Sequence, residues 1–144
     1  MTPSAGRALG LDLGSKRIGV AVADRTGTIA SPLLVLERSG SQKRDHLAIA
    51  ELVAEEEAVI VVVGLPLNMS GSSGPAAKAA VDEAAALATV VNVPVVTFDE
   101  RRTTVTADEA MMEAKMRAQA RRRIVDKIAA AVMLQNWLDA GGPR

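Results

Sequence analysis

The chain has 144 residues, of which 17 are Lys or Arg and 17 are Asp or Glu, so its formal net charge is zero. This length suits one well-buried domain, and the neutral balance gives no sign of nucleic-acid or membrane binding through net charge. The absence of cysteine excludes disulfides, thiolate catalysis and cysteine zinc sites, and a single histidine, His46, excludes a histidine metal cluster. Catalysis in this chain would therefore use carboxylates, lysines, hydroxyls or a hard metal ion bound by oxygen.

Residues 9–23 have the two-residue periodicity of a β-hairpin with its turn at Ser15 and Lys16. One face of this hairpin is aliphatic, and the other consists of glycine and alanine with a single carboxylate, Asp12. Glycine weakens a strand, and close approach by a ligand or by another backbone is a common reason to tolerate it. The small-residue face is either a tight packing site for a helix, with Asp12 bonded to turn amides, or the floor of an active site. We favour the active-site floor.

The pattern beyond the hairpin predicts a strand over 29–36, a helix over about 42–57, a strand over 59–63, a helix over about 76–90, a strand over 93–98 and one or two final helices. Pro32 places the first of these strands at a sheet edge or at a bulge. The uninterrupted Val and Ile residues of 59–63 are typical of a parallel strand buried on both faces. We expect His46 on the surface of its polar helix. The elements predict an α/β fold with one mixed sheet.

Three predicted features gather at the carboxyl ends of the parallel strands, where α/β proteins place their sites. Asp12 lies near the end of the first strand, Glu100 just past the strand 93–98, and the loop containing Asn68 follows the strand 59–63. Carboxylates brought together from separate elements repel one another unless a cation or a proton intervenes. Mg²⁺ or Mn²⁺ suits this role because hard cations prefer oxygen ligands.

A basic segment accompanies these carboxylates, because basic residues outnumber acidic ones between 101 and 127. It includes Arg121, Arg122 and Arg123, which lead into the final helix and precede Asp126. Asp126 could simply pair with one of these arginines across a helical turn, Glu100 could belong to a solvated strand end, and the arginines could form an ordinary charged face. An acidic centre with a basic rim nevertheless favours a nuclease, in which carboxylates bind metal and Lys or Arg binds phosphate.

Four segments together resemble the YqgF (RuvX) family: residues 10–24 (GLDLGSKRIGVAVAD), 63–71 (VGLPLNMSG), 98–101 (FDER) and 125–135 (VDKIAAAVMLQ). Members of this family are described as Holliday junction resolvases or as pre-16S ribosomal RNA nucleases. The resemblance implies a ribonuclease H-like fold, a five-stranded mixed sheet of three antiparallel strands followed by parallel strands and flanked by helices. It also implies a metal-dependent nuclease of the bacterial cytoplasm.

By this resemblance Asp12, Glu100 and Asp126 are the catalytic residues and the ligands of Mg²⁺ or Mn²⁺. The residues expected near substrate are Lys16, Arg17, Asn68, Arg101, Arg121, Arg122 and Arg123. Many resolvases of the wider fold carry a carboxylate just after the fourth strand, where this chain has Gly64, Leu65 and Pro66. The middle carboxylate would here come from Glu100, which leaves open whether one metal ion or two are bound.

We therefore expect one nuclease domain over 1–144, with frayed ends at 1–7 and 140–144, that processes the 5′ end of pre-16S ribosomal RNA. It would be cytoplasmic, without membrane contact, a monomer or homodimer, and it would meet structured RNA or ribosomal precursor particles. The first alternative is a Holliday junction resolvase acting on branched DNA, which would need a symmetric dimer. The second is a non-catalytic ribosome-assembly or transcription-associated protein on the same fold. An ATP-binding module of the actin and sugar-kinase class fits less well, because such proteins need two domains.

Overall fold

The computed structural model describes residues 7–14, 16–65, 75–99 and 118–140. Its elements are β1 (Arg7–Leu13), β2 (Arg17–Ala23), β3 (Ala30–Glu37), α1 (Gln42–Glu55), β4 (Ala58–Leu65), α2 (Pro75–Ala88), β5 (Val95–Asp99) and α4 (Ala118–Asp139). The predicted hairpin, the three further strands and the two helices between them are confirmed. Within the described residues, no helix has the length and apolar character needed to span a membrane.

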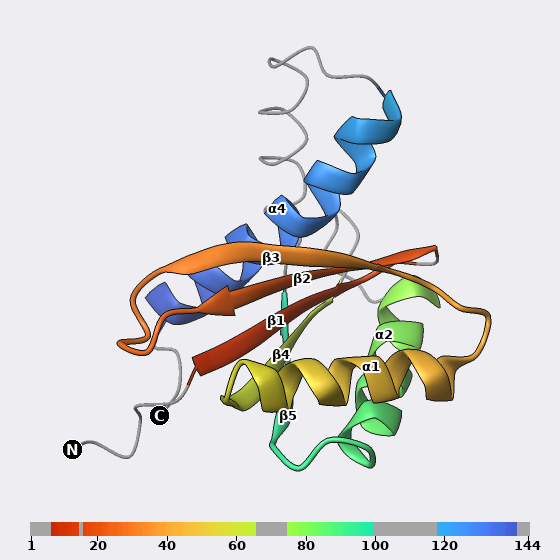
Figure 1. Ribbon diagram of the computed structural model, residues 1–144, viewed down its shortest axis with the longest axis horizontal. Helices are drawn as coiled ribbons and strands as arrows, with labels where there is room; N and C mark the ends of the chain where they lie inside the picture. The colour runs from red at the N-terminus through yellow and green to blue at the C-terminus, as the bar shows by residue number, and fades with distance from the viewer. Residues whose placement is uncertain (1–6, 15, 66–74, 100–117, 141–144) are drawn as a thin grey trace.

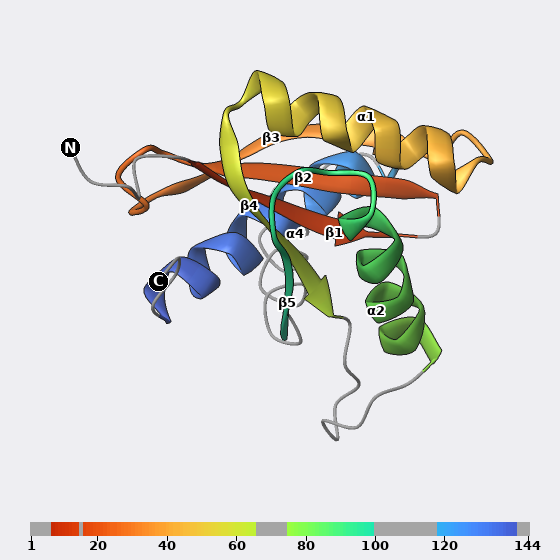
Figure 2. The ribbon, with the colours of Figure 1, turned by 90° about the horizontal axis from the view of Figure 1, so that it is seen from below.

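The strands form one sheet in the order β3-β2-β1-β4-β5. The pairs β1–β2 and β2–β3 are antiparallel, whereas β1–β4 and β4–β5 are parallel. The predicted mixed five-stranded sheet is therefore confirmed. β3 is an edge strand, and its register with β2 shifts next to Pro32, as that proline predicts. Helices α1 and α2 cover one face of the sheet and α4 covers the other (Figures 1 and 2).

The two faces of the sheet contribute to two separate apolar clusters, because successive side chains of a strand point to opposite faces. Leu9 and Leu11 of β1 belong to the cluster beneath α1 and α2. Ala8 of β1 and Ala21 of β2 belong to the cluster beneath α4, which also contains Leu134. The aliphatic face of the hairpin thus packs against two helices, and the small-residue face packs against the third.

At Gly10, the prediction that this small-residue face is an active-site floor is wrong. A Cβ atom added at Gly10 would lie 3.0 Å from Cβ of Leu134, which is tighter than most real Cβ contacts. Gly10 is needed because α4 approaches the sheet closely there, so the helix-packing interpretation holds at this position. The sequence could not identify the neighbour, because Leu134 is far away along the chain.

The prediction of a surface position for His46 is also wrong, because this residue is only 2% exposed. Its Nε2 atom lies 2.8 Å from Oε2 of Glu83 on α2. The same carboxylate accepts two hydrogen bonds, of 2.7 and 2.9 Å, from the guanidinium of Arg38, which follows β3. This buried ionic cluster of Arg38, Glu83 and His46 joins both helices of one face to the end of β3. Its members are distant in sequence, so local polarity could not predict their burial.

The stability of the protein should depend on pH through Glu83. Burial alone would raise the pKa of Glu83, but the hydrogen bonds from Arg38 and His46 and the charge of Arg38 hold this pKa below its ordinary value of 4.5. A carboxyl group with a lowered pKa stabilises the fold above its unfolded pKa, and this contribution disappears as pH falls through the folded pKa. We expect Glu83→Gln to be less stable than wild type at pH 7, by about 1–3 kcal/mol.

This difference in unfolding free energy should shrink as the pH is lowered below 4.5, because protonation then removes the same charge from the wild type. Urea denaturation of both proteins at neutral and at acid pH measures it. A difference that stays constant with pH would contradict the role given to the Glu83 charge.

Candidate active site

Asp12 lies in a row of the sheet in which both neighbouring strands have glycine. On one side it pairs with Gly19 of β2. On the other side, β1 and β4 pair up to Leu11 and Val63, so the next residues, Asp12 and Gly64, are at the same level. Directly opposed residues share a face of the sheet. On the face covered by α4, the two positions directly beside Asp12 on the neighbouring strands are therefore glycines.

Asp12 lies two residues after Gly10 on β1 and points to the same face of the sheet. It is therefore about 7 Å further along the strand than the glycine that Leu134 covers. Gln135 shows how α4 crosses the sheet, because it accepts a hydrogen bond from Ala30 N at 2.9 Å and donates one to Thr28 O at 2.8 Å. The carboxyl-terminal half of α4 thus lies at the start of β3, and its amino-terminal half lies toward the β1–β2 turn (Figures 1 and 2). Asp12 is half-buried at this end of the sheet.

The turn between β1 and β2 brings basic residues close to Asp12. Gly14 N donates to Arg17 O at 2.9 Å and to Asp12 O at 3.1 Å. A Cβ atom at Gly14 would lie 2.6 Å from Arg17 O, so this tight turn requires glycine. Lys16 is exposed and Arg17 is half-buried. Lys16 and Arg17, two of the residues predicted to bind substrate, thus follow the predicted catalytic carboxylate across this tight turn.

Sequence reasoning missed Arg38 as a neighbour of this turn. Arg38 Nε donates to Gly14 O at 2.9 Å, and Arg38 N donates to Lys16 O at 2.9 Å. The side-chain contact joins residues 24 positions apart. Only the pairing of β2 with β3 brings Arg38 to the turn, so no local signal in the sequence could have found it.

Position 126 lies on the stripe of α4 that faces the sheet. It precedes Ala129, Ala130 and Met133 by the spacing of one helix face, and these three residues are at most 1% exposed. The segment of Arg121, Arg122 and Arg123 lies within α4, which begins at Ala118, and does not lead into the helix as expected. The side chains of Asp126 and of these three arginines lie outside the described part of the structure.

Glu100, Arg101 and Asn68 lie outside the described residues. β5 ends at Asp99, which pairs with Leu65 at the sheet end where Asp12 also lies. Phe98 packs against the apolar cluster beneath α4. Over the described ranges there is no group of three His, Cys, Asp or Glu residues able to hold a metal ion. Of the three predicted carboxylates, the structure therefore describes Asp12 and the backbone of Asp126 but not Glu100.

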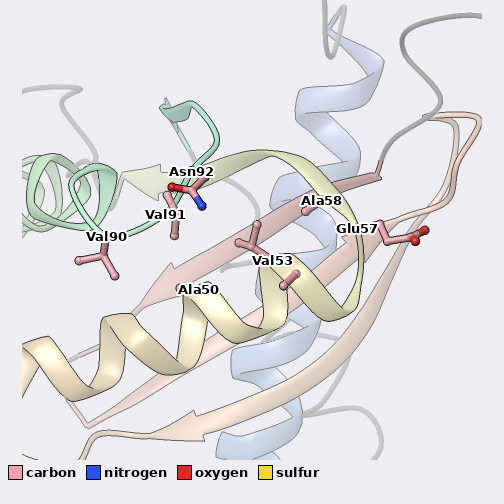
Figure 3. Close-up of a pocket in the computed structure, with 8 residues that line it drawn as sticks. Ala50, Val53, Glu57, Ala58, Val90, Val91 and Asn92 are labelled. Atoms are coloured by element: carbon pink, nitrogen blue, oxygen red, sulfur yellow. The ribbon is translucent and has the colours of Figure 1, made fainter.

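A cavity of about 320 Å³ lies at the opposite end of the sheet (Figure 3). Its lining residues are Ala50, Val53, Ala54, Glu57, Ala58, Val90, Val91 and Asn92. Ala58 pairs with Arg7 at the start of β1, whereas Asp12 is near the end of that strand. Figure 3 shows the Glu57 carboxylate pointing away from the other lining residues, and it forms an ion pair with Arg25. The cavity thus lacks the carboxylates predicted for catalysis.

Comparison with known proteins shows which family the chain resembles. Residues 6–140 match the family RuvX, described as Holliday junction resolvase. A "Putative pre-16S rRNA nuclease" of Mycobacterium sp. (strain KMS) is 46% identical over 138 residues, covering 95% of this chain and 82% of the relative. The protein of the same description from Myxococcus xanthus (strain DK1622) is 45% identical over 137 residues, covering 95% of this chain and 90% of that relative.

Among solved structures, that of Thermus thermophilus RuvC in complex with a Holliday junction substrate has a TM-score of 0.57. It is 17% identical to this chain, and the match covers 94% of this chain and 96% of RuvC. This likeness shows the fold alone, and it confirms the predicted ribonuclease H-like architecture.

Proposed function

The chain belongs to the RuvX family, and from this we propose that it is a metal-dependent endonuclease that processes the 5′ end of pre-16S ribosomal RNA. The observation that carries the proposal is the position of Asp12, between two glycines and next to a basic turn. The relatives described as pre-16S rRNA nucleases support the choice of substrate. On this proposal the 144 residues act as one domain in the cytoplasm, on free precursor RNA or on ribosomal precursor particles.

We propose Asp12, Glu100 and Asp126 as the residues that hold Mg²⁺ or Mn²⁺. The donors are all carboxylate oxygens, the ligands that these hard cations prefer, and Asp12 has glycine beside it on both neighbouring strands. These residues would hold the divalent cation, which would supply positive charge to the phosphodiester and acidify a water molecule.

The proposed role of the basic residues is to bind the phosphates on either side of the scissile bond. Lys16 and Arg17 of the β1–β2 turn are closest to Asp12 along the chain. The other residues proposed to contact substrate are Asn68, Arg101, Arg121, Arg122 and Arg123. Such contacts read the charge of the backbone rather than the bases, so they favour a substrate recognised by its shape.

Cleavage by the purified protein tests this proposal. We expect labelled pre-16S ribosomal RNA to be cut in Mg²⁺ or Mn²⁺, cutting to stop in EDTA, and excess metal to restore it, because the proposed ligands neutralise phosphate charge only through a cation. Circular dichroism in EDTA is the control, since the two core clusters consist of apolar side chains, which bind no metal, and the protein should stay folded. Unchanged cutting in EDTA would contradict metal dependence.

A Holliday junction resolvase is the second candidate, favoured by the description of the matching family. A four-way DNA junction belongs in the same assay, together with a light-scattering measurement of mass. Preferred cutting of the junction by a dimer would favour the resolvase, because two strands must be cut symmetrically. Cutting of neither nucleic acid by folded, metal-loaded protein would favour a non-catalytic role in ribosome assembly or transcription.

A further inference from the structure

We propose that Arg38 is a positioning residue of the nuclease site and that the buried ionic cluster exists to hold it on the β1–β2 turn. The inference deepens the proposed function and rests on it for the readout of cleavage. Its structural part rests only on contacts of the described residues. None of the residues proposed for catalysis belongs to this cluster.

Arg38 connects the turn to the rest of the fold through two different atoms. Its backbone N–H donates to Lys16 O at 2.9 Å, and its side-chain Nε–H donates to Gly14 O at 2.9 Å. The first bond resembles a continuation of the β2–β3 ladder, whose last pair is Arg17 with Glu37. The second bond belongs to the side chain alone. Arg38 therefore holds two carbonyls of the turn that carries Lys16 and Arg17.

The guanidinium is itself held from the side opposite the turn. Glu83 accepts from both terminal nitrogens, at 2.7 and 2.9 Å, which is the bidentate geometry that fixes the plane of an arginine. His46 Nε2 lies 2.8 Å from the same Glu83, and Asp45 Oδ2 lies 3.9 Å from Arg38 Nη1. Two helices thus fix the direction in which Nε–H points, which is toward Gly14 O.

The cluster and Asp12 lie on opposite faces of the sheet. His46 and Glu83 come from α1 and α2, whereas the Asp12 row belongs to the face of α4. Coupling between them must therefore pass through the backbone of the turn. Gly14 provides this path, because its carbonyl accepts from Arg38 while its N–H donates to Arg17 O and Asp12 O. Without the Nε bond, the turn would lose the contact that keeps its basic residues aligned with Asp12.

If Arg38 served only to join the helices to the sheet, its variants would behave differently from those of a positioning residue. Such a role needs a cation opposite Glu83, and Arg38→Lys would supply one. Lysine has no nitrogen at the Nε position and no planar fork, so it cannot bond Glu83 in a bidentate manner and Gly14 O at the same time. The two roles are therefore separated by comparing Arg38→Lys with Arg38→Met.

The experiment measures kcat and KM for cleavage, unfolding by urea and hydrogen exchange at the Gly14 amide in each variant. We expect Arg38→Lys to be more stable than Arg38→Met. Its kcat should nevertheless be about 10- to 100-fold below that of the wild type, because a small misplacement of binding groups has effects of this size. We also expect faster exchange at the Gly14 amide in both variants.

Arg7→Met is the matched control, because Arg7 forms a comparable half-buried ion pair with Glu56, at 2.8 Å, at the opposite end of β1. It should lower stability while leaving kcat and the exchange of the Gly14 amide at wild-type values. Wild-type kcat and wild-type amide exchange in Arg38→Lys would overturn the inference. If the wild type cuts no nucleic acid, the proposed function fails, but the exchange rates still decide whether Arg38 holds the turn.

Discussion

Replacing Asp12 with Asn is expected to lower the rate of RNA cleavage on the order of 10³-fold or more, as removal of a single catalytic group does in hydrolases. The substitution removes the charge of a proposed metal ligand and preserves its size. Asp12 is half-buried and the positions directly beside it on β2 and β4 are glycines, so replacing one carboxylate oxygen by an amide nitrogen leaves the packing at these two positions unchanged. Single-turnover cleavage under saturating Mg²⁺ measures the loss, and urea denaturation should show a stable fold.

Asp24→Asn is the matched control for this experiment. Asp24 is the carboxylate at the other end of the hairpin, where it accepts hydrogen bonds from Thr28 N and Ile29 N at 2.9 and 3.2 Å. The pKa of Asp24 is lowered by these backbone hydrogen bonds, so Asp24 is charged at neutral pH. We expect Asp24→Asn to cleave at close to the wild-type rate. Equal rates of cleavage by Asp12→Asn and by the wild type would show that Asp12 has no part in the mechanism.

The second large effect is expected at the contact between Gly10 and Leu134. Leu134→Ala should lower the free energy of unfolding by about 2–5 kcal/mol, because Leu134 is fully buried and its loss leaves a cavity. Gly10→Val should lower it by about 1–3 kcal/mol, because the added side chain would overlap Leu134. Urea denaturation of the two single variants and the double variant measures both effects.

The double variant should be less destabilised than the sum of the single variants, because valine at position 10 would occupy part of the space left by Leu134. Met133→Ala combined with Gly10→Val is the control, since Met133 is equally buried on the same helix, whereas the three atoms nearest to a Cβ at Gly10 all belong to Leu134. Additive effects in the Gly10–Leu134 pair would contradict close packing of α4 on the glycine.

Most of the fold could be predicted because its information is local. The alternation of residues 9–23 identified both strands of the hairpin, and Pro32 correctly placed the third strand at an edge. The run over 59–63 correctly indicated a central parallel strand, and Val61, Val62 and Val63 are fully buried. The prediction of burial on both faces is wrong at the start of the run, where Val59 is 41% exposed.

The candidate site could be predicted in part. Asp12 stood out as the lone carboxylate on a face of small residues, and the structure places it at the expected end of the sheet, just before the tight turn that leads to Lys16 and Arg17. Glu100 and Asp126 remain predictions, because Glu100 and the side chain of Asp126 lie outside the described residues. The error at Gly10 has a clear cause: close approach of a ligand and close approach of a helix require the same residue.

By itself the sequence determined the order of the elements, the two faces of the hairpin and the identity of its one carboxylate, because periodicity and turn chemistry act between near neighbours. The tertiary structure alone decided that Gly64 lies beside Asp12, that Leu134 covers Gly10 and that His46, Glu83 and Arg38 meet in the interior. Each of these depends on strand register or helix packing between residues distant in the chain. These contacts are determined by the burial of apolar surface from the whole chain, which cannot be worked out from any single segment.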